Sequence, residues 1–75
     1  MDRFEQLREI MALTFDVPPE SISAATTRDS LAKWDSLAHL NLMLAIEDGF
    51  GVTLTVDEMS EMTSVAAILA RVGQG

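Results

Sequence analysis

The chain has 75 residues, no cysteine and one histidine, and 12 Asp plus Glu against 5 Lys plus Arg give it a net charge of −7. Such acidity disfavours nucleic acid and anionic membranes as partners and favours a basic protein. Without cysteine there is no disulfide, thiolate metal site or cysteine nucleophile, and one histidine is too few for a histidine metal cluster. The length allows a single domain over residues 1–75, with little room for an enzyme pocket. Composition therefore favours a binding or carrier module.

The chain shows no sign of membrane insertion or export. No apolar run approaches the roughly 20 residues of a membrane span. The N-terminus, Met-Asp-Arg-Phe-Glu, has neither the basic start nor the apolar stretch of a signal peptide. We expect a cytoplasmic protein, which the absence of cysteine fits.

The first expected element is a helix from Arg3 to Phe15, because apolar residues recur there at helical spacing and Asp2 can cap it. Pro18 and Pro19 prevent its continuation. Residues 16–35 form a long connection, within which we expect a short helical turn at 30–33. Its apolar residues are expected to pin it to the core: Val17, Ile22, Leu31 and Trp34.

A second helix is expected from Ser36 to Asp48, with Asp35 as its N-cap and Gly49 and Gly51 as stop signals. Residues 52–55 alternate like a strand but have no second strand to pair with, so we expect an extended connector. A short helix at 56–61 and a last helix at 64–72, capped by Thr63, complete the chain. The predicted fold is all-α, a small four-helix bundle of three main helices and one short one.

The second helix is predicted to have two apolar faces. At about 100° per residue, one side gathers Leu42, Ile46, His39, Phe50 and Met43, and nearly the opposite side gathers Leu37, Leu40 and Leu44, flanked by Glu47 and Asp48. A bundle this small can hardly surround a helix, so the Leu37 side is expected to be exposed for a protein partner. The alternative is that all the leucines are core. Residues 35–70 contain six acids and no Lys or Arg, which favours a basic partner there.

Ser36 lies where the long connection meets this helix. Free backbone amides and the helix dipole favour a negative group there, so a phosphate ester on Ser36 would be well placed. A catalytic triad is not expected, because His39 turns toward the core and nothing suggests an oxyanion hole. Ser30 lies in a second Asp-Ser-Leu, but no long helix follows it, so Ser36 is preferred.

Residues 31–37, Leu-Ala-Lys-Trp-Asp-Ser-Leu, precede an apolar helix that ends Ile-Glu-Asp-Gly-Phe-Gly-Val at 46–52. This arrangement resembles an acyl carrier protein over essentially the whole chain. The resemblance implies that Ser36, next to Asp35, carries 4′-phosphopantetheine from coenzyme A, whose thiol holds cargo as a thioester. It implies as partners a carrier-protein synthase (a phosphopantetheinyl transferase), an acyl or aminoacyl ligase or transferase, and downstream synthase enzymes.

The resemblance also divides the second helix between docking and core. A docking face is expected from Leu37, Leu40, Leu44, Glu47 and Asp48. Core positions bordering the space for a short cargo are expected at Leu42, Ile46, Phe50 and Ile68. The protein itself would be a monomeric carrier and not an enzyme.

Some positions depart from carriers of primary fatty acid synthesis, whose second helix is usually more acidic. Ala38, Asn41 and Gly49 stand where acids are expected, and Trp34 before Asp35 is more typical of polyketide, peptide-synthetase-like or stand-alone specialised carriers. A specialised carrier is therefore implied, with acyl or aminoacyl cargo left open. We expect Trp34 to cover the core, with contact to the arm or a partner as the alternative.

The sequence suggests two other functions. A non-covalent helical adaptor could bind a basic partner through the Leu37, Leu40 and Leu44 face with an unmodified serine. The acidic residues Glu47–Asp48 and Asp57–Glu58 suggest a calcium site. The spacing excludes it, because acidic residues are missing from the first and fifth loop positions before either glycine.

Overall fold

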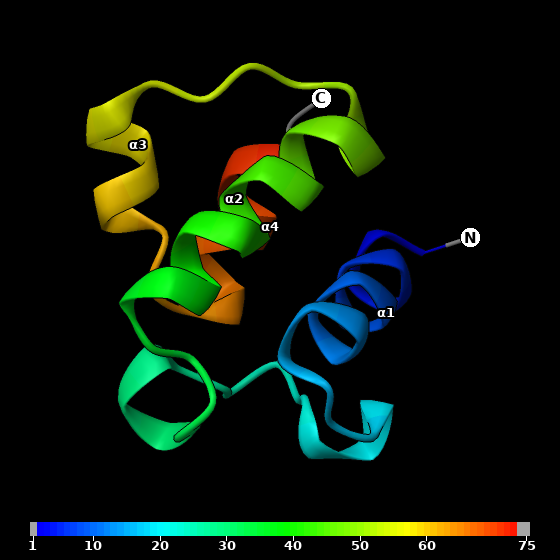
Figure 1. The fold of residues 1–75 in the computed structure, drawn as a ribbon. Coiled ribbons are helices and arrows are strands. Elements are labelled where there is room, and N and C mark those ends of the chain that lie inside the picture. The colour runs from blue at the N-terminus through cyan, green and yellow to red at the C-terminus, as the bar shows by residue number, and fades with distance from the viewer. Residues whose placement is uncertain (1, 74–75) are drawn as a thin grey trace.

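The computed structural model describes residues 2–73. This part of the chain contains four α-helices and no β-strand (Figure 1). They are α1 (Arg3–Phe15), α2 (Ser36–Phe50), α3 (Val56–Glu61) and α4 (Val65–Val72). The expected all-α bundle of three main helices and one short helix is confirmed. None of these helices combines the length and apolar content that crossing a bilayer requires.

Polar side chains cap each helix start, where backbone amides lack intrahelical partners. Asp2 Oδ1 accepts from Phe4 N at 3.0 Å, as predicted for α1. The start of α4 differs from the prediction by one residue, because Ser64 rather than Thr63 supplies the cap, its Oγ accepting from Ala67 N at 3.0 Å.

The second helix runs two residues further than predicted. Gly51 alone ends it, with the left-handed φ of 66° that glycine adopts without strain. Gly49 is helical, and its role is packing: a Cβ there would stand 2.7 Å from Ile10 Cδ1 of α1. Gln6 of α1 also donates to the Gly49 carbonyl at 2.8 Å. The prediction of Gly49 as a stop signal was therefore wrong, because the glycine accommodates the neighbouring helix.

One apolar core lies between α1, α2 and α4 and extends to the loops. Its buried members are Leu7, Met11, Phe15, Ile22, Trp34, Leu42, Met43, Ile46, Leu54, Met62, Val65, Ile68 and Val72. Phe50 packs against this core from a half-buried position, so the four predicted core positions of α2 and α4 lie in or against it.

The long connection between α1 and α2 passes across one end of the bundle (Figure 1). Ile22 and Trp34 are buried and Val17 and Leu31 pack against the core, which confirms the predicted anchors. The expected helical turn at 30–33 was misplaced. Two 3-10 turns occur instead, η1 at Pro19–Ser21 and η2 at Arg28–Ser30, while residues 31–34 hold one hydrogen-bonded turn.

The turn η2 is fastened to the start of α4. Thr27 and Ser64 form an isolated antiparallel bridge. On either side of it, Arg28 N donates to Thr63 O and Val65 N donates to Thr26 O, both at 2.9 Å. These bonds, unrelated to any helical period, fix the segment that leads into α2.

Candidate functional site

Ser36 is the first residue of α2, and its side chain is exposed. The preceding Asp35 occupies two first-turn amides, because its Oδ1 accepts from Ala38 N at 2.9 Å and its carbonyl accepts from His39 N at 2.8 Å. Within residues 2–73 the amides of Ser36 and Leu37 have no protein acceptor. An anion attached to Ser36 would meet these two free donors and the positive end of a 15-residue helix.

An arginine approaches the same hydroxyl. Arg28, in η2, donates from Nη2 to Ser36 Oγ at 3.0 Å. A guanidinium has donors and no acceptor, so it cannot remove the serine proton. Arg28 could not be predicted from the sequence, because the path of this irregular loop follows from its bonds to the start of α4 and not from a local pattern.

His39 is turned away from Ser36, as predicted. Its Nδ1 accepts from Trp34 Nε1 at 3.0 Å, and its Nε2 lies 2.7 Å from the Met59 carbonyl. Since Nδ1 is the acceptor, the ring proton belongs on Nε2, which donates to Met59 O. Both nitrogens are thus engaged in joining α2 to the loop and to α3. Trp34 itself is buried against Phe15, with ring centroids 5.4 Å apart, which confirms it as a core residue.

Two faces of α2 are confirmed. Leu37, Leu40 and Leu44 are 68%, 51% and 53% exposed. On the opposite side, Leu42, Met43 and Ile46 are fully buried. The alternative that all the leucines of α2 are core was wrong.

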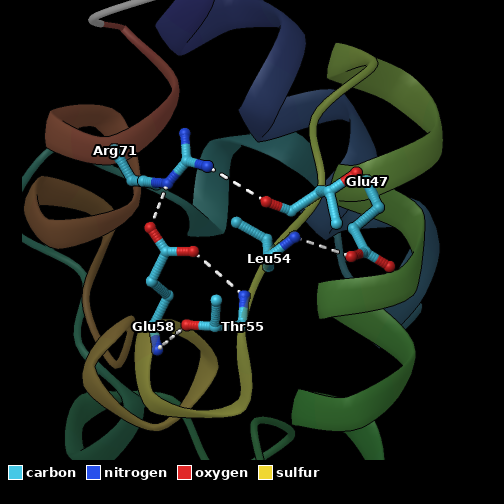
Figure 2. Close-up of polar contacts among 6 residues, drawn as sticks. Glu47, Leu54, Thr55, Glu58 and Arg71 are labelled. Carbon is cyan, nitrogen blue, oxygen red and sulfur yellow. Dashed lines mark hydrogen bonds and ion pairs between the residues drawn. The ribbon is translucent and has the colours of Figure 1, made fainter.

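Polar neighbours of the exposed leucines divide into two groups. Asp48 and Asn41 are exposed. Glu47 is half-buried, and its Oε2 accepts from Leu54 N at 2.8 Å, so this carboxylate holds the connector before α3 (Figure 2). Any contact of Glu47 with a partner would have to coexist with that bond.

The grouping of Ala38, Asn41 and Gly49 as missing docking charges needs correction. Ala38 is half-buried and packs against the core. A side chain at Gly49 would point at Ile10 of α1. Of the three positions, only Asn41 is both exposed and on the side of Leu37 and Leu44.

Within the described residues, an ion pair joins α4 to the acidic helix α3 (Figure 2). Arg71 of α4 pairs through Nε with Glu58 of α3 and donates from Nη2 to Thr53 O at 3.1 Å. The other Glu58 oxygen accepts from Thr55 N at 2.9 Å. These contacts, the Thr55 amide first and then the Arg71 guanidinium, lower the pKa of Glu58 below its ordinary value.

A small helical bundle that presents a serine hydroxyl at a helix start, beside an exposed apolar helix face, has the arrangement of a covalent carrier. Comparison with protein families agrees: residues 5–72 match the family described as phosphopantetheine attachment site. The chain belongs to this family, whose members are carriers of the acyl carrier protein type and bear covalent 4′-phosphopantetheine. Such carriers meet a phosphopantetheinyl transferase and synthase or ligase enzymes, and this favours the covalent carrier over the non-covalent adaptor.

Proposed function

We propose that Ser36 carries the 4′-phosphopantetheine arm and that the protein presents acyl or aminoacyl groups to other enzymes without catalysing a reaction itself. The main support for this proposal is the position of Ser36. It presents an exposed hydroxyl at the start of α2, next to two free amides and a cation. Ser30 is a weaker candidate, since its Oγ donates to Thr27 O and accepts from Thr27 N, both at 2.9 Å. The residues around Ser36 therefore fit a phosphodiester.

Attachment requires a partner enzyme, because the side chain that is hydrogen-bonded to Ser36 is Arg28, a donor that cannot take its proton. The Ser36 oxygen forms a new P–O bond to the phosphopantetheine phosphorus of coenzyme A while the diphosphate bond breaks, releasing adenosine bisphosphate. The hydroxyl proton passes to a base of the transferase. When bound, the arm supplies the thiol that holds cargo as a thioester, which fits a chain that has no cysteine of its own.

The docking face for these enzymes is proposed to be Leu37, Leu40, Leu44 and Asp48, with Glu47 contributing from its edge. The first of these side chains, Leu37, directly follows Ser36, so an enzyme bound to this face can reach the arm. An apolar surface rimmed by acids suits a partner with an apolar groove and a basic rim. We also propose that the protein is a monomer and acts in the cytoplasm.

The attachment site is tested by incubating the protein with coenzyme A and a carrier-protein synthase and measuring its mass. The wild type should gain one phosphopantetheine, and so should Ser30→Ala, the matched control from the other Asp-Ser-Leu. Ser36→Ala should gain nothing. If Ser30→Ala abolished the gain and Ser36→Ala did not, the assignment would be wrong.

For the cargo, we propose a specialised acyl or aminoacyl group loaded by a dedicated ligase or transferase. The support is Asn41, an uncharged residue on the docking face where a more acidic carrier would meet basic enzymes. The arm-bearing protein is expected to be loaded more slowly than a typical fatty-acid carrier by the same malonyl transferase at low salt. Asn41→Glu should recover part of the rate, up to about five-fold for one exposed pair of about 1 kcal/mol. Equal rates for the two carriers would contradict the specialised cargo.

A further inference from the structure

We infer that Arg28 binds the phosphodiester of the arm, an inference that rests on Ser36 being the attachment residue. Its guanidinium already lies 3.0 Å from Ser36 Oγ. The phosphorus would be bonded to this same oxygen, so a group that touches the oxygen is within reach of the phosphate.

Modification changes what Arg28 can bind. The hydroxyl oxygen becomes a bridging ester oxygen, a poor acceptor, and one negative charge spreads over two non-bridging oxygens. A guanidinium presents five N–H donors in a planar fork, which suits two such oxygens. Arg28 would exchange one neutral hydrogen bond for charge-assisted ones, which are shorter and stronger.

The charge of Arg28 is available for this role. Ion pairs within residues 2–73 join Arg8 to Glu5 and Arg71 to Glu58, and Arg28 belongs to neither. Arg28 is also half-buried, so solvent screens its charge less than that of a fully exposed cation. A cation left without a carboxylate in a protein of net charge −7 is suited to an incoming phosphate.

Arg28 is also held in place. Its own amide donates to Thr63 O at 2.9 Å, beside the Thr27–Ser64 bridge, so η2 is fixed against α4. The base of the arm would thus be held on the η2 side of Ser36, leaving Leu37 and Leu44 uncovered for an enzyme. Arg28 would act as a positioning residue for the arm and not as part of the docking face.

The test compares arm-bearing wild type, Arg28→Gln, Arg28→Lys and Lys33→Gln. Lys33 is the matched control, because it is an exposed cation of the same loop and its loss changes the charge equally. The first readout is the ³¹P resonance of the phosphodiester. It should shift and narrow in Arg28→Gln, remain as wild type in Lys33→Gln, and lie between the two in Arg28→Lys.

The second readout is the change in melting temperature when the arm is added. Adding the arm should lower the melting temperature of Arg28→Gln by about 1–8 °C more than it lowers that of wild type, the effect of one ion pair in a domain of this size. A purely structural role for Arg28 would lower the unmodified and modified forms alike and leave this change the same as in wild type.

Failure of the inference is distinguishable from failure of the proposed function. If wild-type Ser36 gains no mass, the attachment site itself is wrong. If it gains the arm, but ³¹P resonance and melting change are the same in wild type and Arg28→Gln, Arg28 does not bind the phosphate. Should the transferase reject the variant, ¹⁵N resonances of the wild-type arginines decide: Arg28 Nε–H must move on modification while Arg8 Nε–H does not, and a stationary Arg28 overturns the inference.

Discussion

Ser36 and His39 are three residues apart on α2, yet their side chains meet opposite surroundings. The serine hydroxyl is exposed and touches a cation, whereas both histidine nitrogens are engaged with Trp34 and Met59. Exposure makes the serine available to an enzyme. Its two hydrogen bonds make the histidine a clamp between the loop, α2 and α3, and this explains why the only histidine of the chain serves structure.

His39→Ala is therefore expected to destabilise the fold by about 1–3 kcal/mol, the usual cost of leaving a buried polar partner unsatisfied. Trp34 Nε1–H would lose its acceptor and Met59 O its donor. Urea unfolding measures the change. Asn41→Ala, an exposed polar residue of the same helix, should stay within about 0.5 kcal/mol of wild type. Equal losses in the two variants would contradict the clamp.

At the scale of the element, α2 shows how one helix serves two surfaces. Leu44 is 53% exposed, while Ile46, two residues along, is fully buried. Leu44→Ser should change the melting temperature little and slow attachment of the arm, because Leu44 is exposed and lies on the proposed docking face. Ile46→Ala should cost about 2–5 kcal/mol of unfolding free energy, as for other emptied core sites. Thermal melts with a modification time course test both.

The opposite pattern, with Leu44→Ser unfolding the protein and Ile46→Ala silent, would mean that the core faces the other side of α2. Loss of modification in Ile46→Ala is informative only in material that remains folded, which its melt establishes.

The helices were the part of the fold that the sequence predicted best. The bounds of α1 and α3 were predicted to the residue, because caps and apolar spacing are local signals. Two roles that the sequence did not reveal share one cause. Gly49 packs against α1 and the loop that holds Arg28 is bonded to the start of α4, so each role depends on a segment distant in the chain. At the site, Ser36 could be proposed from sequence, but the cation beside it could not.

At the scale of the whole molecule, Glu58 and Arg71 link the second half of the bundle. Through Thr53, Thr55 and their own ion pair, they tie the connector to α3 and α4 (Figure 2). Because the fold lowers the pKa of Glu58, its ionised form stabilises the native state. This contribution is complete above the ordinary pKa of 4.5 and is lost as the pH falls through the lowered folded value.

Glu58→Gln should consequently lower the melting temperature at pH 7, and its difference from wild type should shrink as the pH falls below about 4.5. Melts from pH 7 to pH 3 provide the measurement. Glu61→Gln makes the same charge change on α3 at a carboxylate that has no hydrogen bond within residues 2–73, so it should show a much smaller effect at pH 7. A Glu58→Gln deficit that stays constant down to pH 3 would contradict this role of its ionisation.

The bridge between Thr27 and Ser64 also bears on when the protein becomes competent during its synthesis. The backbone of residues 26–28 is bonded to residues 63–65, a segment that is synthesised much later. A ribosome that has extruded Ser36 has therefore not yet supplied the segment that arranges the loop in front of it, and an isolated helix of this length is marginal in water. Attachment of the arm should therefore wait until residues 63–65 have emerged from the ribosome, and chains stalled before residue 63 should stay unmodified. Copies that terminate before residue 63 would then receive no phosphopantetheine from coenzyme A.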